Sequence, residues 1–381
     1  TVVRASYGIF YSPLTGRATS AYDRFPKSRQ YTLQSSSVSP ALLISQTPPI
    51  PTDNTGYNLT HQYDLPNAKV PSFQQINFDI QRELPGHMLV SAGYTSSNGR
   101  HLMRNVQYNQ IPIGVVQAAG KGTQAMRPFP NFANIGYFCE CQSSSYNALL
   151  VNVERRFANG FMMRAAFTWS KFIDEQNDNF SGLFPQDQYN QRAERGLSLS
   201  NIPTRLVVSG LYTLPFGHGQ RFVNNGMMAT LIGGWEVGGI FSVQSGQQVW
   251  IRSSNNTSGT FSQMQRPNIV ADPFLSDSKR TLTKYFNTAA FAAPAPLTFG
   301  NSRKTPNIQG PAWYNLDANL HRDIHLPITE TTRLELRGEC FNCANHANFL
   351  PPDGLQGSTT FGQITSAQAA RTLQVAGKLW F

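Results

Sequence analysis

Residues 313–340 read WYNLDANLHRDIHLPITETTRLELRGEC, and this stretch decides the fold. Apolar and polar side chains alternate from Trp313 to Leu326 and alternate again from Arg333 to Cys340. A period of two residues is typical of a β-strand, because successive side chains point to opposite faces of a sheet. Pro327 to Thr331 separates the two segments, so we predict a hairpin with a short turn.

The same unit recurs along the chain, and each hairpin is followed by a long polar connection. The other predicted hairpins pair Gln74–Leu84 with His87–Ser96, Asn147–Phe157 with Phe161–Ile173, and Arg205–Leu214 with Trp235–Ile251. With Thr1–Tyr11 as the first strand and Arg371–Phe381 as the last, we predict ten strands whose short turns all lie on one side. The long connections on the other side are residues 12–72, 98–146, 174–201, 252–312 and 344–368.

The lengths of strands and connections favour a membrane barrel. Many of the predicted strands have ten to thirteen residues, which matches the ~9–11 residues that cross a bilayer and exceeds the ~5–6 of a globular strand. Such long connections are unusual in a compact soluble domain and expected outside an outer-membrane barrel. We therefore predict an all-β, antiparallel transmembrane barrel with long extracellular loops, with a soluble β-sandwich as the alternative because it also alternates.

The composition indicates a folded chain with few charges. Of its 381 residues 14% are charged and 12% are aromatic, whereas average domains have about 25% charged residues. The net charge is +10, but the basic residues are scattered, so we predict no nucleic-acid partner. We interpret the charge as that of a polar surface that happens to be basic, with contact with anionic lipid head groups as the second interpretation. Thr1 to Ala5 shows neither an initiating Met nor a signal segment, so we expect a mature fragment that begins inside a fold.

The two faces of the predicted strands differ in chemistry. One row is apolar and is expected to face lipid, while the other is polar and is expected to face a wet lumen. The predicted lumen-facing residues are Gln75, Asn77, Asp79, Asn315, Asp317, Asn319, His321, Arg333, Glu335, Arg337, Glu339 and Lys378. Rings near strand ends predict an interfacial aromatic girdle, with ordinary core aromatics as the alternative. They are Tyr7, Tyr11, Phe157, Trp169, Tyr212, Trp235, Trp313, Tyr314, Trp380 and Phe381.

The four cysteines stand in two close pairs, Cys139 with Cys141 and Cys340 with Cys343. Disulfides are the default in an oxidising exterior, and we expect them in loops, with all three connectivities open. A four-thiolate zinc site is the alternative.

The sequence contains no nucleophile elbow, no phosphate-binding glycine loop and no HExxH motif. We therefore predict no enzymatic activity, no cofactor and no metal. His321 stands near Asp317 and Asp323, and we interpret it as part of a solvated polar face, with a lumenal cluster as the alternative.

An ordered series of short motifs resembles the C-terminal half of the barrel of Oar-like TonB-dependent receptors of the acidobacterial type. The motifs span nearly the whole chain. They are QRELPG from Gln81, GY at Gly93, TWSK from Thr168, LPFGHG from Leu214, GGW from Gly233, QSG from Gln244, FNTAAF from Phe286, FGN from Phe299, CFN from Cys340, NH at Asn345, NF at Asn348 and FGQITSA from Phe361.

The resemblance implies an outer-membrane location and a barrel of about 22 strands closed around a plug. It also implies coupling to TonB through an N-terminal region that this chain lacks. Phe381, with Val375 and Leu379 at alternating positions before it, resembles the terminal signal read by the barrel-assembly machinery. The other partners it implies are outer-membrane lipid, lipopolysaccharide and an unknown extracellular substrate.

We therefore predict that residues 1–381 are the C-terminal part of one barrel domain in a receptor that binds and translocates a substrate. A structural or adhesive surface barrel is the first alternative, and a secreted soluble glycan-binding β-protein is the second. The long connections are expected to carry any specificity.

Overall fold

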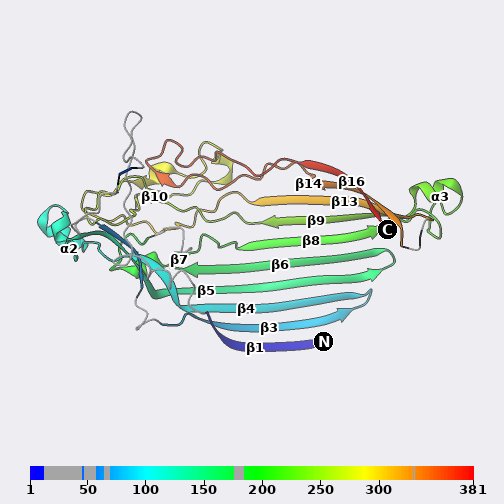
Figure 1. Cartoon of the computed structure of the whole chain (residues 1–381), viewed down its shortest axis with the longest axis horizontal. Helices are drawn as coiled ribbons and strands as arrows, with labels where there is room; N and C mark the ends of the chain where they lie inside the picture. Colours follow the sequence, from blue (N-terminus) through cyan, green and yellow to red (C-terminus); the bar gives the residue numbers. More distant parts are fainter. Residues whose placement is uncertain (13–44, 47–56, 64–68, 176–183, 328, 330) are drawn as a thin grey trace.

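A computed structural model describes residues 1–12, 45–46, 57–63, 69–175, 184–327, 329 and 331–381. One large sheet forms the body of the molecule, and its long strands lie side by side (Figure 1). In sheet order they are β1 (Val2–Tyr11), β3 (Ser72–Leu84), β4 (Met88–Gln107), β5 (Phe132–Ala158), β6 (Phe161–Asp174), β8 (Thr204–Thr213), β9 (Trp235–Gln244), β13 (Trp313–His325), β14 (Arg333–Phe341) and β16 (Thr372–Trp380).

Each long strand is antiparallel to its neighbours. The predicted antiparallel sheet of ten long strands is therefore confirmed. Two short strands extend it: β2 (Tyr57–Tyr63) pairs with β5, and β7 (Gly196–Leu197) pairs with β6. The sheet order begins with β1 and ends with β16, so these two strands are its edges.

Short turns join strands at one end of the sheet, which we term the turn end, and long segments join them at the other, the loop end (Figure 1). Between β5 and β6, Asn159 and Gly160 have φ of 53° and 74°. Two consecutive positive φ angles form a turn whose twist matches a hairpin, and Asn-Gly is the preferred pair for it. The connection between β8 and β9 is longer and contains helix α3 (Gly226–Ile232).

The register places the apolar residues of neighbouring strands in continuous rows on one face, which we term the apolar face. Directly paired residues in antiparallel strands point to the same side of a sheet. One row runs through Ile80, Ala92, Val151, Phe167, Leu206, Val243 and Tyr314. Ile76, Phe78 and Ile80 are each more than 40% exposed. Large apolar side chains on this face are therefore open to the surroundings.

Two aromatic residues of the predicted girdle lie on the opposite, polar face. Trp313 is paired with Gln244, and Trp380 is paired with Arg333. Their assignment to an outward girdle was wrong, because each is one residue out of step with the apolar row of its strand. Tyr7 and Trp169, by contrast, lie on the apolar face and are 64% and 61% exposed.

The connection predicted over residues 98–146 contains long strand extensions instead. Arg104 to Gln107 of β4 pair with Gly136 to Cys139 of β5, beyond the predicted strand ends. Met103, Val106, Ile135 and Phe138 of these extensions are buried. Because these side chains are buried within the molecule, the extensions lack the strict alternation of a strand that faces lipid on one side. The predicted strand from Trp235 to Ile251 in turn ends early, at Gln244.

The connection over residues 252–312 also has structure. Phe286, Ala290, Phe291 and Ile308 of this connection form a small apolar core with Val249 and Ile251, which precede it. Short strands frame it, namely β10 (Arg252–Ser253), β11 (Asn268–Ile269), β12 (Phe291–Ala292) and β15 (Leu355–Gln356). Helix α2 (Ile113–Ala119) lies at the same end of the sheet (Figure 1). Most of the predicted connection 12–72 lies outside the described residues.

Helices contribute little to this fold. In the described part of the chain, no helix is both long and apolar enough to span a bilayer.

Candidate functional site

The predicted polar row of β3 lies on the polar face with residues of both neighbouring strands. Asn77 is paired with Ser6 of β1 and Thr95 of β4. The Thr95 hydroxyl donates to Asn77 Oδ1 at 2.6 Å, and Asn77 Nδ2 donates to Ser6 Oγ at 3.4 Å. Gln75 and Asp79 share this face because they stand two residues away on either side. Asn77 therefore links the polar faces of three strands through its side chain.

The predicted residues near the C-terminus also share the polar face. The structure brings them together with Glu236 of β9, which the sequence did not single out. We define the charged patch as Glu236, His321, Asp323, Arg333, Glu335, Arg337, Glu339 and Lys378.

Close contacts between oppositely charged or polar side chains connect most of the charged patch. His321 Nε2 lies 3.0 Å from Glu236 Oε2, so its partner comes from β9 rather than from Asp317 or Asp323. Arg337 lies 2.5 Å from Glu335 and 3.5 Å from Glu339. The Arg337 side chain is 46% exposed, and exposed pairs contribute only about 0–1 kcal/mol each. The patch is therefore a hydrated surface rather than a buried stabilising core.

Asn315, Asp317 and Asn319 continue the same row of β13 toward the loop end. Asp317 Oδ1 accepts the backbone N–H of Asn342 at 2.8 Å. This bond ties β13 to the segment that leaves β14.

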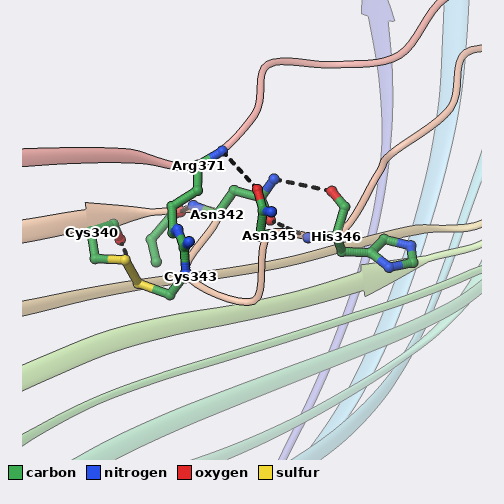
Figure 2. Close-up of a disulfide and its surroundings, with 7 residues drawn as sticks. Cys340, Asn342, Cys343, Asn345, His346 and Arg371 are labelled. Atoms are coloured by element: carbon green, nitrogen blue, oxygen red, sulfur yellow. Dashed lines mark hydrogen bonds between the residues drawn. A yellow bond between two sulfur atoms is a disulfide. The ribbon is translucent and has the colours of Figure 1, made fainter.

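The structure joins Cys340 to Cys343 where β14 ends, and Figure 2 shows the surrounding turn. Asn342 has a φ of 50°, a left-handed conformation that Asn tolerates better than most residues. Its side chain donates to the His346 carbonyl and accepts the His346 N–H, both at 3.0 Å. Asn345 Oδ1 accepts the backbone N–H of Arg371 at 3.4 Å. The turn therefore links the end of β14 to the residue just before β16.

The second bridge joins Cys139 to Cys141. Both residues lie within β5, so the expectation that the bridges would lie in loops was wrong for this pair. Residues i and i+2 of a strand share a face, which brings the two side chains together. Among the described residues, no group of three His, Cys, Asp or Glu side chains is arranged to hold a metal ion.

A buried ionic cluster at the loop end was missed by sequence reasoning. We define it as Arg104, Asp174, Glu194, Arg266 and Lys304. Arg266 Nη1 lies 2.6 Å from Glu194 Oε2, with both side chains at most 3% exposed. Lys304 pairs with Asp174, and both are also buried. These residues are isolated in the sequence, so no local pattern indicates them.

Amide groups complete the surroundings of Glu194. The backbone N–H of Gln186 donates to Glu194 Oε1 at 3.1 Å, and Gln186 Oε1 accepts the backbone N–H of Arg266 at 2.8 Å. Burial lowers the pKa of the Lys304 ammonium below its ordinary value, and the charge of Asp174 opposes that shift. The cluster therefore fixes the long connections to one another at the ends of the strands.

A cavity of about 350 Å³, which we term the mouth cavity, opens on the polar face at the loop end. Arg205, Gln244 and Trp313 are paired across three strands and form its floor. Phe349 and Gln368 come from the segment between β14 and β16. Two aromatic rings, one cation and several amides suit a polar ligand with an apolar side.

The chain is similar to a known family of membrane proteins. A family model described as "Outer membrane beta barrel domain" matches residues 1–374. No curated protein matches the chain.

Solved structures resemble it at low identity. The outer membrane transporter YddB from Escherichia coli aligns over 86% of this chain and 34% of its own, with 8% identity and a TM-score of 0.50. FpvA of Pseudomonas aeruginosa, solved with bound pyoverdine and iron, aligns over 99% of this chain and 30% of its own, with 10% identity and a TM-score of 0.44. The chain thus spans about a third of the length of these two structures.

Proposed function

Because the chain belongs to the outer membrane β-barrel domain family, we propose that it forms the C-terminal part of the barrel of a TonB-dependent receptor. The protein resides in the bacterial outer membrane, so the alternative of a secreted soluble protein was wrong. In such barrels short turns face the periplasm and long loops face the outside. The loop end is therefore extracellular, and the apolar face meets lipid.

The open sheet carries this proposal. Its edges are β1 and β16, and in our proposal both strands cross the bilayer, where unpaired backbone groups cost several kcal/mol each. In our proposal, strands from elsewhere in a longer protein pair with these two edges and form hydrogen bonds with their backbone groups. The polar face then lines a wet lumen. YddB, described as a transporter, has about three times the aligned length. Residues 1–381 are then one part of a single barrel domain, whose plug and TonB-contacting region lie outside this chain.

We assign the mouth cavity as the contact for an extracellular substrate on its way into the lumen. It lies on the polar face, where Arg205 and Trp313 offer a cation and a ring to a passing ligand. The Oar-like subtype rests on the ordered motifs alone. The alternative, a structural or adhesive barrel that transports nothing, predicts the same sheet but no plug and no TonB contact.

The decisive experiment uses the full-length gene product purified in detergent. The periplasmic C-terminal domain of TonB from the same bacterium is titrated against it. We expect saturable binding that is lost when the N-terminal TonB-contacting segment is scrambled and kept when the mouth residue Trp313 is changed to Ala. Absence of binding by a full-length product without a plug favours the structural or adhesive barrel.

A further inference from the structure

A second cavity, of about 400 Å³, lies at the loop end and has a strongly basic lining. We term it the basic cavity. Lys171, Arg192, Arg195 and Arg303 line it together with Asn307, and none of the described residues adds a carboxylate to the lining. Four positive charges around one hollow repel one another, so the site favours an anion.

The cavity lies on the apolar face, immediately beyond the lipid-facing belt. Lys171 stands two residues after Trp169 on β6 and therefore points to the same side. Trp169 is paired with Leu149 of β5, which is paired with Tyr94 of β4, and all three are exposed. The Tyr94 hydroxyl donates to Asn147 at 2.7 Å, and Asn147 is the partner of Lys171. The surface thus changes from apolar to polar at this level.

Most of these positive charges are free to bind an anion. In the part of the chain that the structure describes, Lys171, Arg192 and Arg303 form no ion pair. Arg195 lies 3.7 Å from Glu175 and donates to Ser143 Oγ at 2.9 Å. One of the four cations is therefore partly neutralised.

The scaffold of the cavity is well connected. Leu197 of β7 pairs with Ile173 of β6, and its carbonyl accepts the Thr305 hydroxyl at 2.7 Å. Lys304, next to Arg303, is anchored by its buried pair with Asp174. The basic side chains therefore project from backbone that is held in place from three segments.

We propose that the basic cavity binds a phosphate group of lipid A in the outer leaflet of the outer membrane. The position selects this source, because lipopolysaccharide phosphates lie at the outer boundary of the hydrocarbon layer, where the apolar belt ends. Arg and Lys bind phosphate through charge-assisted hydrogen bonds. A neighbouring cavity of about 700 Å³ also has a lining that includes Arg195, but Glu140 and Glu175 line it as well, which makes it a poorer phosphate site.

Titration of the full-length protein in detergent with fluorescent bis-phosphorylated lipid A tests this. We expect the double variant Lys171→Gln/Arg303→Gln to weaken binding about tenfold, since each substitution removes a charged hydrogen-bond donor. Lys171→Arg/Arg303→Lys keeps both charges and should restore it. Lys121→Gln/Lys279→Gln removes two exposed charges elsewhere in the extracellular loops and should leave binding unchanged. A mobility shift on boiling before electrophoresis verifies that each variant is folded.

Two further titrations identify the source of the phosphate. Dephosphorylated lipid A should bind the wild type as weakly as bis-phosphorylated lipid A binds the Gln variant. Inorganic phosphate should compete only at far higher concentration. Equal affinity for inorganic phosphate would show a free-anion site and overturn the lipid assignment. If the Lys121→Gln/Lys279→Gln control lost as much affinity for lipid A, the loss would come from general surface charge. That result would also overturn the proposal of a specific site.

Discussion

At the scale of single residues, the buried pair between Arg266 and Glu194 holds the extracellular loops. Both side chains are nearly inaccessible, and the two residues lie 72 positions apart in the chain. Gln186 forms a hydrogen bond with each of them. Removing one member of such a pair leaves an uncompensated buried charge. Breaking the pair between Arg266 and Glu194 is therefore expected to lower the stability of the loops strongly.

We predict that Arg266→Met destabilises the loop assembly by about 3–5 kcal/mol, because Glu194 is left charged without its partner. Limited chymotrypsin digestion of the folded protein in detergent should then cut the loops much faster. Arg164→Met breaks the pair with Glu154, whose side chains are 67% and 38% exposed, and should cost at most about 1 kcal/mol. Equal digestion rates for the two variants would contradict the assignment.

Asp187, in the same loop region, gives a pH-dependent prediction. Burial raises the pKa of its carboxyl above the ordinary 3.8, although the Tyr189 N–H opposes the shift. The folded state thus favours the protonated form, and Asp187 costs stability as the pH rises from about 3.8 through the raised folded pKa.

Asp187→Asn keeps an acceptor for the Tyr189 N–H and removes the charge. We expect slower loop digestion than in the wild type at pH 7 and a smaller difference between the two at pH 4. Asp277→Asn changes a carboxylate that is 94% exposed, and it should alter neither rate. Faster digestion of the Asp187 variant at pH 7 would mean that its negative charge stabilises the loop.

At the scale of elements, the sequence predicted those strands whose two faces meet different surroundings. In β13 and β14 lipid on one side and water on the other impose strict alternation, so both ranges followed from the pattern. The extensions of β4 and β5 were not predicted, because Val106 and Phe138 are buried there and the side chains do not alternate between lipid and water. The buried ionic cluster could not be predicted from the sequence for another reason. Its members are far apart in the chain and come together only in the folded structure.

The edge strand β16 allows a test of the terminal signal. Val375 and Phe381 are 89% and 88% exposed along this edge, available to a binding partner. We predict that deletion of Phe381 lowers the amount of heat-modifiable barrel in outer-membrane fractions severalfold. Gln374→Ser, on the opposite face of the strand, should leave the amount unchanged. Normal assembly without Phe381 would remove the signal interpretation.

At the scale of the whole molecule, our proposal gives each of three surfaces a different environment. The apolar face meets lipid, the polar face with its charged patch meets water, and the folded loops cover the extracellular end. This arrangement requires that both edges of the sheet are paired with other strands, because an edge exposed to lipid leaves backbone N–H and C=O groups without hydrogen bonds. The remaining question is whether β1 and β16 pair with each other or with strands from a longer chain.

Cysteine cross-linking in cells decides between these two closures. In a background with the native cysteines replaced, Val3→Cys of β1 is combined in turn with Cys at Leu373, Val375 and Leu379 of β16, all on the apolar face. We expect no bridge in the full-length protein, because strands outside this chain separate the two edges of the larger barrel. Leu334→Cys/Leu379→Cys joins directly paired positions of β14 and β16 and should cross-link as a positive control. A bridge from Val3 to any β16 position, with the control also formed, would instead establish a small barrel of these ten strands closed on itself, and a lumen that narrow has no room for a plug.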